Sequence, residues 1–170
     1  LAVGEDIDYV KVKAVASGSQ LVAGRDDILI LAEGRLASIG EGYEVVGKMK
    51  GKDLIGLEYQ PLYPFTGELI EGEQKDKMVN AYKVYPAKFV TTEDGTGVVH
   101  TAVMYGADDF ELGNQVGLPK HHLVDLAGNF IKGTGFLEGR FVKDEAVAVD
   151  IIKDLAHRGL LQKKEKYEHS

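Results

Sequence analysis

The residue types that could do chemistry are concentrated in one stretch, residues 91–110, with the sequence TTEDGTGVVHTAVMYGADDF. In residues 93–97 two glycines flank a threonine, which lets the backbone adopt positive φ and approach a ligand closely. Residues 98–103 form a β-branched apolar run typical of a buried strand, and His100 is the basic residue within it. We therefore expect a tight glycine loop that leads into a strand carrying one imidazole.

Two carboxylates follow this strand. Asp108 and Asp109 lie after a turn at residues 105–107, where a helix is expected to begin. Aspartate is favoured at the N-cap and in the first turn, where it accepts hydrogen bonds from free N–H groups and complements the helix dipole. Because one cap suffices, the second carboxylate can face the turn that carries His100. The stretch predicts a pocket with one anionic and one imidazole wall, and the plainer interpretation is a core histidine beside a capped helix.

Other chemistries find little support in the sequence. His121 and His122 are adjacent, so on a strand they point to opposite faces and cannot bind one metal together. A metal site that combines His100, Asp109 and one of them is a minor alternative, and we expect no metal. The absence of cysteine excludes disulfides, thiolate zinc sites and a cysteine nucleophile. Neither a phosphate-binding glycine motif in its strand-to-helix context nor a G-x-S-x-G elbow is found.

Composition predicts a single domain over residues 1–170, because 170 residues with 44% hydrophobic and 28% charged residues can bury a sizeable core. No apolar run approaches the roughly 20 residues that span a bilayer, and no signal peptide is recognisable, so we expect a cytoplasmic protein. The net charge of −7 argues against broad nucleic-acid binding, but not against contact with one nucleotide at a strand end. The start at Leu1 rather than Met suggests a piece of a longer protein.

Periodicity gives the surrounding elements. Alternation predicts a half-exposed strand over residues 9–15, joined as a hairpin to residues 21–23. Helical spacing predicts helices over residues 26–39, 108–116 and 144–158. Further strands are expected at residues 43–46, 81–92, 98–103, 123–125 and 130–131. Helices that do not alternate strictly with the strands predict a mainly β, α+β fold, a closed or nearly closed β-barrel with flanking helices.

A basic stretch lies between the expected strands. Lys48, Lys50 and Lys52 fall within residues 47–56, which glycines interrupt. The usual interpretation of such a run is a solvated loop, and the functional one is a contact to RNA phosphates.

Residues 95–110, GTGVVHTAVMYGADDF, resemble the motif of the editing domain that is inserted in class I aminoacyl-tRNA synthetases of the isoleucyl, valyl and leucyl group. The isoleucyl enzymes are the most similar. Further similar pieces occur in the same order at residues 51–62, 117–119 and 166–170. The resemblance thus extends along the chain and implies a β-barrel editing domain excised from a longer synthetase.

The resemblance implies hydrolysis of the ester of valyl-tRNA(Ile) by a positioned water. One methylene is worth only about 1–3 kcal/mol in a hydrophobic pocket, a limit for which isoleucyl enzymes are themselves the standard example, so a second sieve must remove the product. The family's pocket aspartate falls on Asp109, which would bind the α-ammonium group. Its histidine falls on His100, which would exclude isoleucine sterically. We favour this role over a general base, because an aminoacyl ester is already reactive.

The resemblance also implies contacts and partners. Five residues would line the entrance for the terminal adenosine: Thr91, Thr92, Gly95, Thr96 and Gly97. The expected partners are the acceptor end of tRNA(Ile) carrying valine and the synthetase body of the parent chain, which would bind ATP outside this segment. We expect a monomer that needs no cofactor of its own.

Two departures from the family pattern keep an alternative open. A threonine-rich part of the family's pocket would precede Leu1, and Val103 stands where the family often has proline. The alternative is a folded but catalytically incomplete module that only binds the aminoacylated 3′ end. A metal-dependent hydrolase that uses the histidines is a third hypothesis.

Overall fold

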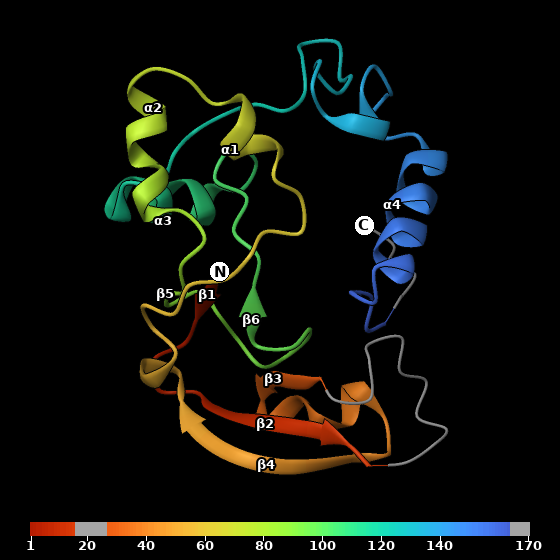
Figure 1. Ribbon diagram of the computed structural model, residues 1–170. Helices are drawn as coiled ribbons and strands as arrows, with labels where there is room; N and C mark the ends of the chain where they lie inside the picture. The colour runs from red at the N-terminus through yellow and green to blue at the C-terminus, as the bar shows by residue number, and fades with distance from the viewer. Residues whose placement is uncertain (16–26, 164–170) are drawn as a thin grey trace.

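The protein is described by a computed structural model that covers residues 1–15 and 27–163, with two small sheets and helices around them (Figure 1). The first sheet has the order β5-β1-β6 and consists of β1 (Ala2–Val3), β5 (Tyr85–Pro86) and β6 (Val98–Val99). In it β1 is parallel to β5 and antiparallel to β6. The second sheet has the order β3-β2-β4 and consists of β2 (Asp8–Ala14), β3 (Ile28–Ala32) and β4 (Tyr43–Lys50), with antiparallel pairs.

Strand β2 is the centre of the second sheet, and its side chains reach two separate cores. Tyr9 is fully buried and packs with Val3 and Ala32, which connects the second sheet to the first. Val10 and Val12 are also fully buried and pack with other apolar residues of the second sheet. Strand β2 is therefore central in two ways, since its edges pair with β3 and β4 and its buried side chains contribute to both cores.

The remaining regular elements are short helices, apart from α3 and α4. The α-helices are α1 (Phe65–Leu69), α2 (Glu73–Asp76), α3 (Ala107–Val116) and α4 (Glu145–His157). The 3-10 helices are η1 (Glu33–Ile39), η2 (Gly51–Asp53), η3 (Lys77–Asn80) and η4 (Gly135–Leu137). Across residues 1–15 and 27–163, no helix has both the length and the apolar character that a membrane span requires.

Helix α4 is tied to a distant part of the chain. The Tyr63 hydroxyl donates a hydrogen bond to the Asp154 carboxylate at 2.8 Å. The Arg158 guanidinium lies 4.9 Å from the centre of the Tyr63 ring and donates to the Leu62 carbonyl oxygen at 2.9 Å. These contacts hold the C-terminal helix against the segment that precedes α1.

Several predicted elements agree with the structure. The strand over residues 9–15 is β2, and the helices over residues 108–116 and 144–158 are α3 and α4. Asp144 caps α4 as its sequence position predicts, because its carboxylate accepts a hydrogen bond from the Ala146 N–H at 2.9 Å. The predicted hairpin partner at residues 21–23 lies outside the described residues.

The predicted helix over residues 26–39 is wrong. In the described part of it, residues 28–32 form β3 and only η1 follows as a helix. Ile28 and Ile30 are 53% and 38% exposed, whereas Leu31 is 2% exposed, so the run alternates as a strand does. Pairing along the whole of β3 with β2 outweighs the helical spacing of these residues.

Of the other predicted strands, one is longer than expected and the rest are shorter. Strand β4 continues to Lys50, so residues 47–50 are not a loop. Residues 81–92 and 98–103 each keep only two residues in a strand, while Val124 and Phe130 form an isolated bridge. Residues 66–77, for which no regular element is predicted above, contain most of α1 and the whole of α2.

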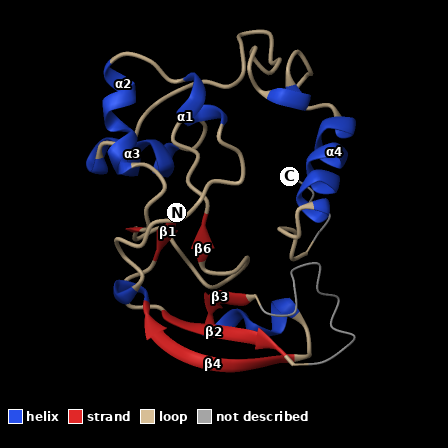
Figure 2. Cartoon of the chain, in the orientation of Figure 1, coloured by secondary structure: helices blue, strands red, loops and turns tan. Residues whose placement is uncertain are grey.

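The closed or nearly closed barrel is not confirmed, although the mixture of helices and strands is. Within the described residues the strands form two separate open sheets, which Figure 2 shows one above the other. The strands of the first sheet are two residues long, too short to form a continuous wall. Pro86 has no N–H group to continue the ladder, and β6 ends three residues before the turn at residues 103–105.

Candidate functional site

His100 lies directly after β6, where it lines a cavity of about 370 Å³. The pairing of Val99 with Ala2 brings it close to Leu1. The imidazole is exposed at the edge of the cavity, yet the surrounding protein lowers the pKa of His100, chiefly by desolvation. The Leu1 ammonium group also lowers this pKa, while the Asp109 carboxylate raises it. Above its pKa the imidazole is neutral, so His100 is mostly uncharged at neutral pH.

Asp109 is the third residue of α3, and its carboxylate turns back toward the residues that follow His100. Its Oδ2 atom accepts a hydrogen bond from the Ala102 N–H at 3.0 Å. The N–H groups of Tyr105 and Gly106 donate to the Ala102 carbonyl oxygen at 2.9 and 3.3 Å. Residues 102–109 thus form a closed turn, called the carboxylate turn below.

Gly106 is the N-cap of α3, and neither aspartate caps the helix, contrary to the expectation for one of them. A Cβ at position 106 would lie 2.8 Å from Asp109 Oδ2. The carboxylate therefore occupies the space that a larger side chain would need. An anion in the first turn of a helix is stabilised by the helix dipole.

The glycine loop, residues 93–97, is held by the second sheet. The Tyr9 hydroxyl donates to the Gly97 carbonyl oxygen at 2.6 Å, and the Ala32 N–H donates to the Thr96 carbonyl oxygen at 2.8 Å. Arg35 Nε donates to the Gly95 carbonyl oxygen at 2.8 Å. Both glycines have positive φ, +63° at Gly95 and +76° at Gly97. The loop is therefore tight, as its sequence predicts, and its backbone acceptors are in use.

The structure brings two of the predicted site residues together and holds the others apart. Asp109 is close enough to His100 to shift its pKa. The predicted entrance residues do not line the His100 cavity: Thr91, Thr92, Gly95, Thr96 and Gly97. The three threonines among them are exposed. The loop precedes β6 and His100 follows it, so the loop and the cavity lie at opposite ends of this strand.

The sequence analysis missed the aromatic walls of the cavity. Five of the eight tyrosines line it: Tyr59, Tyr63, Tyr82, Tyr85 and Tyr105. The rings of Tyr59 and Tyr82 meet edge to face with 6.0 Å between their centres. The gathering of these tyrosines between positions 59 and 105 was the available signal.

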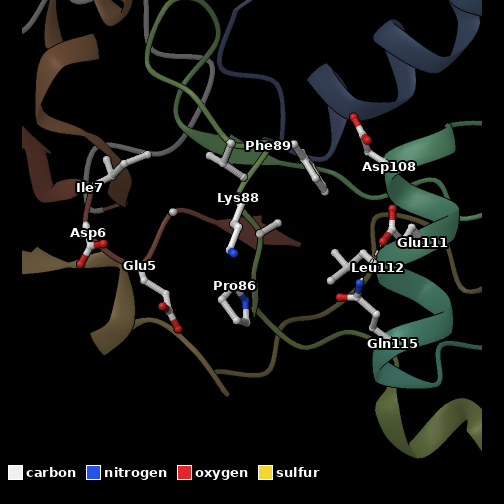
Figure 3. A pocket seen from close by; sticks show the side chains of 13 residues that line it. Glu5, Asp6, Ile7, Pro86, Lys88, Phe89, Asp108, Glu111, Leu112 and Gln115 are labelled. Carbon is white, nitrogen blue, oxygen red and sulfur yellow. Dashed lines mark hydrogen bonds between the residues drawn. The ribbon is translucent and has the colours of Figure 1, made fainter.

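A second cavity of about 860 Å³ is lined by α3 and by residues 4–7 and 86–90. Figure 3 shows Glu5 and Asp6 on one side of it, Asp108 and Glu111 on the helix opposite, and Lys88 between them. In the described part of the chain, no three His, Cys, Asp or Glu residues are grouped so that they could hold a metal ion.

The lysines of the basic stretch make ion pairs on the second sheet. Lys48 Nζ lies 2.7 Å from Glu33 Oε1, and Lys50 Nζ lies 2.7 Å from Asp8 Oδ1. Hydrogen bonds to these carboxylates raise the pKa of both lysines. The carboxylates compete with any phosphate for these ammonium groups, which disfavours the RNA-contact interpretation.

Comparison with known proteins finds relatives over the whole chain. The isoleucine–tRNA ligase of Bacillus thuringiensis (strain Al Hakam) is 38% identical over 171 residues, which cover 100% of this chain and 14% of that protein. Those of Bdellovibrio bacteriovorus and Methanopyrus kandleri are 38% and 36% identical, covering 100% and 99% of this chain and 15% of each relative. No protein-family model matches the chain. The chain therefore spans 14–15% of the length of these curated relatives.

Proposed function

Because the chain belongs over its whole length to the isoleucine–tRNA ligase family, as a segment of it, we propose that it is the family's editing domain. Its reaction is hydrolysis of the ester that links valine to tRNA(Ile), carried out by a positioned water. The observation that carries the proposal is the carboxylate turn, which sets Asp109 beside the wall of the His100 cavity. The motif of residues 95–110 supplies the same two residues.

Asp109 binds the α-ammonium group of the valyl ester. One carboxylate oxygen accepts from the Ala102 N–H, and within residues 1–15 and 27–163 the other has no hydrogen-bond partner. The first contact fixes the orientation of the carboxylate, so that the second oxygen is available to a cation. A charge-assisted hydrogen bond of this kind is about twice as strong as a neutral one.

His100 acts as a wall rather than as a base. Its lowered pKa leaves the imidazole neutral at physiological pH, which avoids repulsion of the substrate ammonium group at Asp109. A neutral ring at the cavity edge limits the length of the amino-acid side chain. The ester needs only a positioned water and the neighbouring ribose hydroxyl, since it is already reactive.

The glycine loop contacts the RNA rather than the amino acid. The base and the 5′ phosphate leave a ribose in different directions, so an ester near His100 allows the terminal adenine to extend toward the loop. Thr91, Thr92 and Thr96 are exposed there, and at Gly95 no atom lies within 4 Å of the place where a Cβ would stand, so a base edge can approach the backbone. These five residues form the adenosine entrance in the proposal.

The proposal includes the setting of the domain. Residues 1–170 form one domain of a longer cytoplasmic synthetase, which is monomeric, binds the acceptor end of tRNA(Ile) and holds ATP elsewhere. The threonine-rich stretch that the resemblance implies would complete the cavity beside Leu1, which lies in its wall. The domain itself uses no cofactor.

Asp109→Ala in a complete synthetase tests the proposal. We expect valyl-tRNA(Ile) to accumulate while isoleucine activation continues, because the ammonium contact is lost. Asp108→Ala is the matched control, since Asp108 is the neighbouring carboxylate but does not bond to Ala102. Unchanged clearance of valyl-tRNA(Ile) by the Asp109 variant would rule out its assigned role.

The second candidate is a module that binds the aminoacylated 3′ end without turnover. It is favoured by the separation of the glycine loop from the cavity, which leaves the cavity wall without the loop's backbone groups. Hydrolysis of valyl-tRNA against isoleucyl-tRNA, measured for this chain and for a form extended upstream of Leu1, separates the two. Turnover by either form contradicts the binding module, and binding without turnover by both contradicts the hydrolase.

A further inference from the structure

Tyr105 is exposed in a way that folding does not explain. It lines the His100 cavity, yet it remains 68% exposed. The carboxylate turn holds its backbone, through the Tyr105 N–H bond to the Ala102 carbonyl oxygen and the Asp109 bond to the Ala102 N–H. A large ring presented by a fixed turn at the mouth of a cavity is available to a ligand at low entropic cost.

Further aromatic and cationic groups continue this surface. The His122 ring meets the Tyr105 ring edge to face, with 6.1 Å between their centres. Lys120 Nζ lies 4.0 Å from the centre of the Phe110 ring, which is 44% exposed. Two contacts therefore join the segment of residues 105–110 to that of residues 120–122. We call these four residues, Tyr105, Phe110, Lys120 and His122, the aromatic rim.

We propose that the aromatic rim binds the unpaired nucleotides that precede the terminal adenosine of the RNA, with a base stacked on Tyr105 and a phosphate near Lys120. The inference rests on the proposed function, which places the ester beside His100. The RNA strand then leaves the cavity past Tyr105, away from the glycine loop. Proteins recognise single-stranded RNA largely by stacking its bases on aromatic side chains.

The charges around the rim favour stacking over phosphate contacts. Asp108 and Glu111 are exposed on α3 beside Phe110, and they oppose the attraction of Lys120 for phosphate. Lys120 Nζ also donates to the Asn114 side-chain oxygen. Since each phosphate contact to a single strand changes the salt slope by about 0.7, we expect a slope of only about one contact.

Affinity for a short RNA tests the rim. The purified chain is titrated with a fluorescent single-stranded RNA that ends in CCA, at several salt concentrations. Tyr105→Ala should weaken binding about tenfold, because base stacking on an aromatic ring is worth about 1–3 kcal/mol, with the salt slope unchanged. Tyr105→Phe should keep the affinity, and Lys120→Met should lower the slope by about 0.7.

Leu126→Ala is the matched control for an exposed apolar side chain away from the cavity, and it should bind as the unchanged chain does. Circular dichroism checks that each variant is folded. An affinity that Tyr105→Ala does not alter, or no binding by the unchanged chain, overturns the inference.

Valyl-tRNA hydrolysis in the complete synthetase separates this inference from the proposed function. A Tyr105→Ala variant with a KM about ten times higher and an unchanged kcat supports both. Loss of RNA affinity in an enzyme that never clears valyl-tRNA supports the rim and contradicts the editing role. Normal hydrolysis with unchanged RNA affinity contradicts only the rim.

Discussion

The glycine loop and the carboxylate turn flank β6, and they are held in opposite ways. Four hydrogen bonds hold the loop, one each from the Tyr9 hydroxyl and the Ala32 N–H and two from the Arg35 side chain, so its backbone is anchored to the second sheet and to the helix η1 that follows β3. The turn is held largely by its own residues, with the Asp109 carboxylate as its side-chain contact. The same carboxylate is the proposed ligand group. Changes that disturb the loop's anchored backbone should therefore act first on stability, and changes to the Asp109 carboxylate of the turn first on function.

The largest effect on stability is expected for Gly97→Ala. Gly97 has φ of +76°, and a Cβ there would lie 2.6 Å from Ala32 Cβ. The left-handed backbone and the overpacking together should cost about 3 kcal/mol. Urea unfolding of the purified variant measures this loss as a lower midpoint.

Gly95→Ala is the matched control, because φ is +63° there but no atom lies within 4 Å of the added Cβ. Only the backbone cost of about 1 kcal/mol should appear. Equal midpoints for the two variants would show that the loop does not pack on the second sheet as described.

Local signals in the sequence predict the parts of the fold that depend on neighbouring residues. Helices α3 and α4 have helical spacing, acidic first turns and glycine after their last turns, so both could be predicted. The strand at residues 28–32 could not be predicted, because the apolar run of these residues suits a helix as well as a strand. Pairing with β2 decides between them, and such a long-range contact leaves no local signal.

Tyr9→Phe tests the loop through a single buried hydroxyl. This group donates to the Gly97 carbonyl oxygen at 2.6 Å and accepts from the Gly4 N–H at 3.1 Å. Its removal leaves two buried backbone groups unpaired, so we expect a loss of about 1–3 kcal/mol in the free energy of unfolding. Thermal and urea unfolding measure the loss.

The control is Tyr85→Phe, which removes a hydroxyl that donates to the Asn80 carbonyl oxygen at 2.6 Å from a half-buried position. Solvent can replace that bond, so the loss should be smaller. If Tyr9→Phe unfolds no more easily than Tyr85→Phe, the loop is not anchored by Tyr9.

The candidate site shows the same division between local and long-range information. The proximity of Asp109 to His100 follows from one turn in a continuous stretch, and the sequence predicts it. The cavity that His100 lines is formed by segments far apart in the chain, including Tyr59 and Tyr82. No periodicity connects those tyrosines, and their concentration between positions 59 and 105, the one signal in the sequence, does not specify which of them meet.

The turn is tested through the pKa of His100, which lies below about 6.5 in the folded chain. The Asp109 carboxylate raises this pKa, so Asp109→Asn should lower it further, while Asp108→Asn should change it less. Titration of the His100 ring protons by NMR measures both. A His100 pKa that moves equally in the two variants would contradict the geometry of the turn.

The same group makes stability depend on pH. The unfolded chain binds a proton at His100 more readily than the folded chain does. The contribution of the neutral His100 ring to the free energy of unfolding is therefore fully present above about pH 6.5. It is lost as the pH falls from there through the folded pKa. Urea midpoints of the unchanged chain and of Asp109→Asn across this range should show a wider loss in the variant.

The smallest effect is expected at the second sheet's lysines, Lys48 and Lys50. Their pairs with Glu33 and Asp8 are exposed, and such pairs contribute little because water and salt screen them. Lys48→Met should leave the urea midpoint almost unchanged. It should also leave the salt slope of RNA binding unchanged, unlike Lys120→Met. A lower slope with Lys48→Met would place RNA phosphates on the second sheet. The second sheet would then bind RNA, and not only support the glycine loop.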